Sequence, residues 1–440
     1  MARSPVLDRR APAAAAPGRS SRRRRRLRLG WSLDLLFFGY PLFWVLGLHS
    51  FAWQLCAVPL LGHLVLQRRV RVPRGMGVWF TFLAWNLLSV TQLQRSAQLI
   101  GFSYRYSLYL SATVVFLFVY NAPTALLPLR RVYSWCAALW ITTVAGGWLG
   151  VMVPNGGFTS GLERVLPSRL AEDLFVQDLV HPSFAQVQQF LGYPLGRPQA
   201  PFAYTNHWGA AFAILTPVVL LGWAHLNGSR YQLAPQLLLT ASLVPAIVSL
   251  NRGMFLSLLV ALVYASARSG RVGANARRAL LATLVLVVVL LAVTPLGNLA
   301  QERNDNQHSN SGRATLYGQA LDYAGRSPFL GFGAPQEVEG DLLLPPVGTQ
   351  GQIWLVLVSH GYVGALLYVA FLLVLFRDTR RLPARTSVAH LLVVVALVEM
   401  FVYDLLTVPH HIVFLVVAAA LADKRRAADL ESSPTTSGAA

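Results

Sequence analysis

Three arginines stand where an anion could be bound between apolar segments of the chain. Arg252 lies in "VSLNRGMFLSLL", in a short turn between two apolar runs, and Gly253 would allow a tight turn and close approach of a ligand. Arg313 lies in "SNSGRATLYGQALDYAGRSPFLGFGAP", and Arg197 precedes "PQAPFAYTNHWGAA". A guanidinium offers paired hydrogen bonds whose geometry suits phosphate. Alternatively, these arginines lie at a membrane edge, snorkelling to the interface or touching lipid headgroups, with aromatic anchors beside Arg197.

The segment after Arg313 has the spacing of a short helix. Leu316, Ala320 and Tyr323 recur at helical intervals, and the following "AGRSP" is a typical stop signal. We therefore expect a short helix along the outer membrane surface that begins just after "SGR". Arg313 would then lie at a helix N-terminus, where unpaired N–H groups and the helix dipole favour an anion.

Two titratable residues fall inside apolar runs. Glu399 lies in "LVVVALVEMFVYD", and a carboxylate within a membrane span is either functional or paired. We expect it to bind substrate or, alternatively, to pair with an arginine of a neighbouring helix. His360, in "LVLVSHGYVGALLY", is expected to be a hydrogen-bonded histidine of the protein core.

Composition defines the elements that must position these residues. The 440 residues are 55% apolar and only 12% charged, whereas a soluble domain carries about 25% charged residues. Apolar runs long enough to cross a bilayer recur along the whole chain. We predict an all-α, polytopic integral membrane protein with about 12 transmembrane helices and a large extracytoplasmic loop containing short amphipathic helices. The net charge of +19 comes from short clusters between apolar runs, so we expect no nucleic-acid partner.

The charge pattern predicts the topology. Basic clusters fall at alternate loops, which places both termini in the cytoplasm by the positive-inside rule. We expect a basic disordered arm at 1–30, a single transmembrane domain at 31–424 and a disordered cytoplasmic tail at 425–440. Loops at about 154–206 and 298–350 would lie outside. The candidate spans are approximately 31–48, 50–67, 76–93, 106–126, 133–153, 207–226, 232–250, 254–268, 279–297, 351–376, 387–404 and 411–422.

Three blocks in order resemble the O-antigen ligase and polymerase family. They are "GRPQAPFAYTNHWGAA", then "SLNRGMFLSLLVAL", then the stretch from "SGRATLYGQALDYAGRSPFLGFG" to "GTQGQIWLVLVSHGYVG". The third block is the most specific, because a long ordered pattern ending in P-x-x-G-x-G recurs there. The resemblance covers mainly residues 190–375.

The resemblance implies glycosyl transfer on the outer face of the bacterial inner or plasma membrane. A glycan on a polyprenyl diphosphate would pass to a hydroxyl of a glycan or lipid acceptor, by ligation or polymerisation. Arg252 and Arg313 would bind the diphosphate and stabilise charge on the leaving group, and Arg197 would assist. Such electrostatic stabilisation needs neither metal nor cofactor. The alternative is a transporter or flippase of a lipid-linked glycan, with the arginines lining its path.

The sequence departs from the family at the position of the general base. The family's ligases carry a His-Asn pair where this chain has Gln350 and Gly351, and a glutamine can only orient a hydroxyl. The tryptophan expected after "GR" is replaced by Tyr317, so we interpret the chain as a divergent subgroup with a different acceptor. Deprotonation would be late and solvent-assisted, or a base would come from among His308, Glu337, Glu339 and Asp341. We expect Tyr317, His308 and Asp341 to be among the residues that bind substrate.

Overall fold

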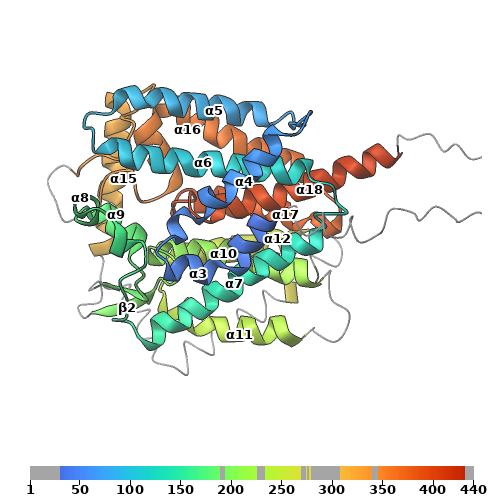
Figure 1. The fold of residues 1–440 in the computed structure, drawn as a ribbon, viewed down its shortest axis with the longest axis horizontal. Helices are drawn as coiled ribbons and strands as arrows, with labels where there is room; N and C mark the ends of the chain where they lie inside the picture. Colours follow the sequence, from blue (N-terminus) through green and yellow to red (C-terminus); the bar gives the residue numbers. More distant parts are fainter. Residues whose placement is uncertain are drawn as a thin grey trace, which may run out of the picture.

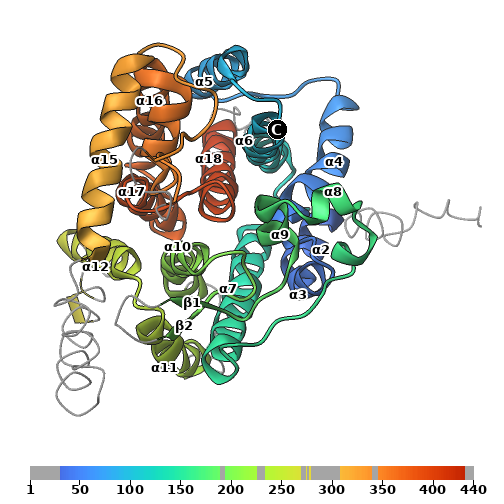
Figure 2. The same cartoon turned by 90° about the vertical axis from the view of Figure 1, so that its left-hand side faces the viewer.

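The protein is a bundle of helices aligned with its long axis, with one helix lying across one end (Figures 1 and 2). The computed structural model describes residues 30–188, 194–224, 233–268, 308–338 and 345–431, together with residues 274, 277 and 278. The expected N-terminal arm, the span at 279–297 and the end of the C-terminal tail lie outside the described residues.

The described segments form the following helices in chain order: α2 (Trp31–Phe38), α3 (Tyr40–Val45), α4 (Ala52–Val65), α5 (Met76–Leu88), α6 (Gln98–Asn121), α7 (Leu129–Met152), α8 (Ser168–Ala171), α9 (Leu174–Val180), α10 (Thr205–Ala224), α11 (Leu233–Val248), α12 (Arg252–Ala267), α15 (His308–Arg326), α16 (Gln352–Thr379), α17 (Val388–Glu399) and α18 (Pro409–Glu431). Short 3-10 turns occur at His49–Phe51, Ser89–Gln92, Glu163–Val165 and Ala384–Thr386.

Three of these helices, α6, α7 and α16, are long and apolar enough to cross a membrane. Shorter apolar stretches lie in α10, α11 and α12. Every expected span that falls within the described ranges coincides with a helix or a pair of helices. The mostly helical fold is therefore confirmed, and the count of twelve spans stays a prediction.

The structure differs from the expectations at one domain boundary and in one outer segment. Helix α18 continues to Glu431, past the boundary expected at Lys424, so residues 425–431 are helical and not disordered. The outer segment 154–206 adds a two-stranded antiparallel sheet, β1 (Ala185–Gln188) and β2 (Leu195–Pro198), to a fold expected to be all-α. Gly196 lets this hairpin approach α7, because a Cβ there would lie 2.3 Å from the Pro154 ring.

Helix α16 is broken at Gly361, whose φ is 69°. The segment Pro328–Gly333 binds the break: Phe332 N–H donates to Val358 O (3.0 Å), Gly333 N–H to Ser359 O (2.8 Å), and Tyr362 N–H to Pro328 O (2.8 Å). The break would otherwise leave these backbone groups without a helical partner. Residues 328–333, which carry the P-x-x-G-x-G pattern, therefore bridge the broken helix with backbone hydrogen bonds. We name this segment the splint.

The splint ties α15 to α16. Helix α15 ends where residues 328–333 begin, and it crosses the end of the bundle from α12 to α16 (Figure 2). Its buried residues Leu316 and Ala320 form a cluster with Val338, Val347 and Val358. The helical spacing read from the sequence is therefore confirmed, and the apolar face it defines packs on the protein. The helix begins at His308, before "SGR", so Arg313 lies in its second turn and the expectation of an N-terminal position is wrong.

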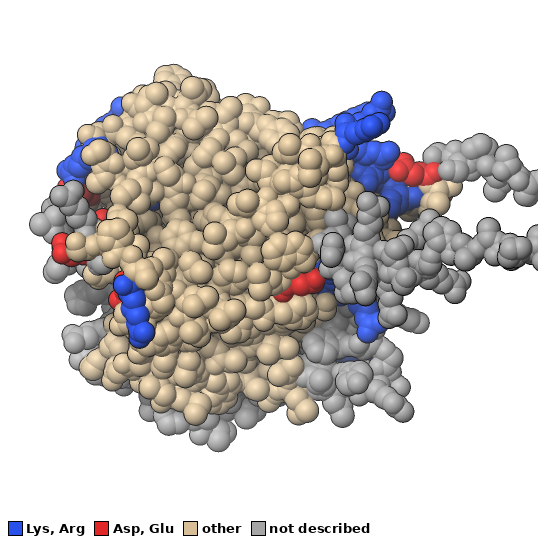
Figure 3. Space-filling model, in the orientation of Figure 1, with Lys and Arg blue, Asp and Glu red and all other residues tan. Residues whose placement is uncertain are grey.

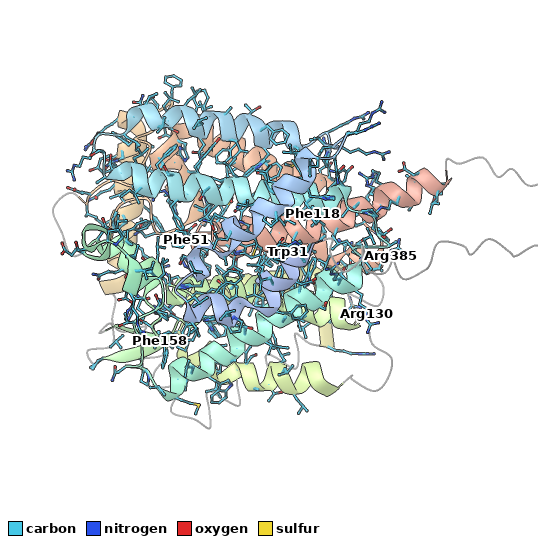
Figure 4. The ribbon with its side chains drawn as sticks, viewed as in Figure 1. Trp31, Phe51, Phe118, Arg130, Phe158 and Arg385 are labelled. Atoms are coloured by element: carbon cyan, nitrogen blue, oxygen red, sulfur yellow. The ribbon has the colours of Figure 1, made fainter. Side chains whose placement is uncertain are left out.

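Charged residues gather at the two ends of the bundle. Figure 3 shows Lys and Arg mostly at these ends, separated by a wide band of other residues. Figure 4 places Arg130 and Arg385 at one end and Phe158 toward the other. We call the first the basic end, where Arg71 pairs with Asp429 (3.4 Å) and Arg385 with Asp423 (2.8 Å). We call the second, with β1, β2 and α15, the loop end.

The splint leads to a stability prediction. We expect Gly331→Ala to lower the free energy of unfolding by more than about 1 kcal/mol, because Gly331 has φ 63° and a Cβ there would lie 2.5 Å from His360 N. The measurement is the thermal unfolding of the purified protein in detergent. Gly318→Ala is the matched control: its Cβ would meet nothing within 4 Å inside α15, so it should be neutral or stabilising. Equal destabilisation by both variants would contradict the splint.

Candidate functional site at the loop end

Arg197 is a buried structural arginine. Its side chain is 6% exposed, and it lies on β2. Its Nε donates to Ser249 O at 2.7 Å and its Nη2 donates to Asn251 Oδ1 at 2.6 Å. Both acceptors belong to the turn between α11 and α12. Arg197 therefore fixes the turn that precedes Arg252.

Asn251 extends this link to α10. Its Nδ2 donates to Thr205 O (2.9 Å), at the first residue of α10. Gly209, one turn further along α10, makes room for it, because a Cβ there would lie 2.6 Å from Asn251 Nδ2. The hairpin, α10 and the start of α12 are consequently held together at one point.

Arg252 is the first residue of α12 and its side chain is exposed. The helix N-terminus that the sequence suggested for Arg313 is thus found at Arg252, where the dipole favours an anion. Tyr403, from the segment after α17, holds this end of the helix: Met254 N–H donates to the Tyr403 hydroxyl at 2.7 Å. Gly253 permits the contact, since a Cβ there would lie 2.9 Å from Tyr403 Cζ.

Arg313 is linked to Tyr403 by its charge. Its side chain is exposed on α15. The charges of Arg197 and Arg313 both act on the Tyr403 hydroxyl. Tyr403 is therefore the common neighbour of the two outer-loop arginines and of the helix that starts with Arg252. Of the three arginines, Arg197 is buried and binds the turn before Arg252, whereas Arg252 and Arg313 are exposed. That Arg252 and Arg313 form one site stays a prediction.

Tyr317 anchors α15 to the same segment. Its ring stacks on Trp354 with centroids 4.5 Å apart, and its hydroxyl lies 3.5 Å from Phe401 O. Trp354 Nε1 donates to that same carbonyl at 3.0 Å. Tyr317 thus gives α15 an aromatic contact with the start of α16.

Gln350 precedes α16 and bonds locally, its Nε2 donating to Thr349 Oγ1 at 2.9 Å. The residue that orders this region is instead Gln352, which is fully buried. Its Nε2 donates to the Tyr109 hydroxyl (2.7 Å) and its Oε1 accepts from Leu405 N–H (3.1 Å). Sequence reasoning missed Gln352, although "GTQGQIW" contains it.

Glu399 is fully buried, and neither carboxylate oxygen has a hydrogen-bond partner among the described residues. The expected ion pair with a neighbouring arginine is therefore wrong within this part of the chain. His360 is hydrogen-bonded through Nδ1 to Ser89 Oγ at 2.6 Å, which confirms its expected place in the core.

Of the four bases considered in the outer loop, only Glu337 has a side chain within the described part of the structure. Glu337 Oε1 is paired with Arg95 Nη1 at 2.6 Å, and both side chains are largely exposed. Helix α15 begins with His308, whose side chain is outside the described part of the structure, and Glu339 and Asp341 lie outside the described residues. Within the described ranges, no group of three or more His, Cys, Asp or Glu side chains is arranged to hold a metal ion.

A polar cluster that sequence reasoning missed follows Tyr403 directly. Asp404 Oδ2 lies 3.8 Å from His207 Nε2, and Asp404 Oδ1 accepts from Leu406 N–H at 2.8 Å. The charge of Arg105, from α6, acts on the same carboxylate. The signal was present in "GFSYRYSLYL", because an arginine within an apolar helix is costly and marks a functional site by default.

Tyr204 packs edge-on against His207, with ring centroids 5.1 Å apart. Its hydroxyl donates to Asp178 Oδ2 at 2.7 Å. Burial, followed by this hydrogen bond and the nearby carboxylates, raises the pKa of Tyr204 well above its usual range. The Tyr204 phenol therefore stays protonated, donates to Asp178 and packs beside His207.

The O-antigen ligase family model matches residues 236–369. This segment, less than a third of the chain, is similar to the O-antigen ligase family. The matched region contains Arg252, Arg313, Tyr317 and Gln350, together with the splint and the first part of α16. Arg197, Glu399 and Asp404 lie beyond it. A search of curated proteins finds no match for the chain. The match suggests glycosyl transfer in glycan assembly, and the matched family is membrane-integral and acts on lipid-linked glycans.

The arginines should differ in what they do for stability. We expect Arg197→Ala to lower the free energy of unfolding by about 1–3 kcal/mol, because it leaves the buried Ser249 carbonyl and Asn251 amide oxygen without their donor. Arg313→Ala changes an exposed side chain and should stay within about 0.5 kcal/mol of the wild type. Thermal unfolding in detergent measures both. An Arg197→Ala variant that unfolds at the same temperature as the wild type would exclude the structural role of Arg197.

Proposed function

We propose that the protein transfers or polymerises a polyprenyl-diphosphate-linked glycan onto an acceptor hydroxyl, on the outer face of the bacterial cell membrane. Both termini would be cytoplasmic and the loop end would face outward. The observation that carries the proposal is the O-antigen ligase match over Arg252 and Arg313, two exposed arginines that are both linked to Tyr403. Met254, in the helix that Arg252 begins, donates to the Tyr403 hydroxyl, and the charge of Arg313 acts on that hydroxyl.

Arg252 and Arg313 would bind the diphosphate of the donor. In the reaction the acceptor oxygen forms a bond to the anomeric carbon, and the bond from that carbon to the diphosphate oxygen breaks with its electron pair. Negative charge therefore grows on the diphosphate. Two guanidiniums and the N-terminal N–H groups of α12 would stabilise that charge without reorganisation, which is the condition for electrostatic catalysis. We propose that this chemistry is metal-independent.

Arg197 would act as a positioning residue. Because its guanidinium is committed to Ser249 and Asn251, it would hold Arg252 in place and not contact the donor. Gln350 would orient the acceptor hydroxyl, and Tyr317 would keep α15 at its place on α16. Glu399 is buried, so we do not include it among the groups that contact the glycan.

His207 and Asp404 would supply the base that Gln350 cannot provide. The acceptor's proton would pass to His207, and Asp404 at 3.8 Å would stabilise the imidazolium that forms. Asp404 is next in sequence to Tyr403, which contacts the start of α12. The pair therefore belongs to the same corner of the loop end as the arginines, as a base must.

The arginine hypothesis predicts a location for the stalled substrate. We expect Arg252→Ala and Arg313→Ala each to abolish polymer formation or attachment, because the leaving-group charge loses its counterion. The lipid-linked precursor should then accumulate on the outer face, as measured by its access to an added impermeant glycosidase. Arg95→Ala, at an exposed arginine paired with Glu337, is the control and should transfer normally. Precursor trapped inside would favour the flippase instead.

The base hypothesis predicts a loss of rate with intact binding. We expect Asp404→Asn to reduce the transfer rate about 100-fold or more, because His207, the proposed base, loses the carboxylate that stabilises its imidazolium. The amide keeps the acceptor for Leu406 N–H. The same substitution at Asp178, which accepts from Tyr204, is the control. Transfer is measured with purified protein and lipid-linked donor. An Asp404→Asn variant with a normal rate would exclude this carboxylate.

A further inference from the structure

A basic cleft of about 440 Å³ opens at the basic end of the bundle. It contains none of the three arginines of the loop end. It lies where α4, α6 and α18 end. Four arginines line it, and a single carboxylate faces them: Arg69, Arg71, Arg425, Arg426 and Asp429. Figure 3 shows the Lys and Arg atoms gathered at this end of the molecule.

The single carboxylate does not balance the cleft. Asp429 pairs with Arg71 at 3.4 Å, and both side chains are more than half exposed, so this pair is weak. Arg426 donates to the backbone carbonyl of Ala122, and this contact does not neutralise its positive charge. Like charges placed together in a cleft repel one another unless an anion joins them. The cleft therefore has the electrostatics of an anion site.

Arg425 gives the cleft a specific donor. Its guanidinium lies over the Tyr120 ring, 4.5 Å from the centroid. Its Nε and Nη1 atoms are buried and have no hydrogen-bond partner within the part of the chain that the structure describes. Burying such N–H groups without an acceptor costs free energy, which an acceptor oxygen of a ligand would recover.

An exposed apolar stripe runs along α4 to the rim of this cleft. It consists of Val58, Leu61 and Val65, which are spaced three and four residues apart and so share one helix face, and Leu66 just after the helix. His63 and Gln67, from the same segment, line the cleft itself. A ligand that fills both features needs an anionic head and an apolar tail.

We propose that the cleft binds an anionic phospholipid. Its phosphate would be held by Arg69 and Arg425, and its acyl chains would lie along the α4 stripe. Basic pockets between helices at the cytoplasmic side of a membrane recognise lipid phosphates in this way. The shared chemistry is a phosphate oxygen, which free phosphate also presents. The adjacent stripe favours the lipid, because free phosphate would leave it unused.

Native mass spectrometry of the full chain in a neutral detergent tests the proposal. We expect phosphatidylglycerol to bind more tightly than phosphatidylcholine with the same acyl chains. The double variant Arg69→Gln/Arg425→Gln should weaken phosphatidylglycerol binding about fivefold for each charge removed. Arg130→Gln, an exposed arginine of the same end outside the cleft, should bind like the wild type. Arg425→Lys keeps the charge but lacks the buried Nε and Nη1 donors, so it should bind phosphatidylglycerol more weakly than the wild type and more tightly than the double variant.

Three results would overturn the proposal. Equal binding of the two lipids excludes recognition of the anionic head. Equal loss in Arg130→Gln shows that general surface charge is responsible. Competition by millimolar inorganic phosphate, together with unchanged lipid binding in Leu61→Gln, identifies a free-phosphate site and removes the role of the stripe. A circular dichroism spectrum like that of the wild type in each variant keeps these outcomes interpretable.

Discussion

The break in α16 at Gly361 is the constraint on which the loop end depends. A helix that is interrupted within an apolar bundle must find other partners for its backbone groups, and residues 328–333 supply them with three hydrogen bonds. Trp85 Nε1 adds a donor to the carbonyls of Phe329 and His360, at 3.2 and 3.1 Å. The two glycines of this segment are thus explained by backbone geometry, since Gly331 and Gly333 both have positive φ.

Contacts of the neighbouring backbone also position Arg252 and Arg313. Helix α15 runs into the splint, so the position of Arg313 is set by the joint at α16. Arg252 is set from the opposite side, by the turn that Arg197 and Asn251 hold against α10. Tyr403 lies between the two supports. The buried Arg197 and the break in α16 therefore hold the backbone from which the exposed Arg252 and Arg313 side chains extend.

Much of the helical fold could be predicted because it follows from apolar runs within single segments. The buried face of α15, with Leu316 and Ala320, was predicted from spacing alone. The start of that helix was not, because polar residues such as those in "HSNSG" are as common in loops as at helix ends. Sequence spacing also cannot report contacts across the bundle. The burial of Arg197 and the approach of Asp404 to His207 both join segments far apart in the chain.

The splint has a consequence for how the chain enters the bilayer. Gly361 is nine residues beyond Gln352, so the break lies about 14 Å along α16 from its first residue, at 1.5 Å of rise per residue. If α16 spans the membrane from that residue, the non-helical backbone of residues 328–333 reaches the depth of the hydrocarbon. Such backbone is tolerated there only when protein surrounds it. Residues 328–333 would then form a re-entrant stretch, which inserts stably only once α5 and α16 are both beside it.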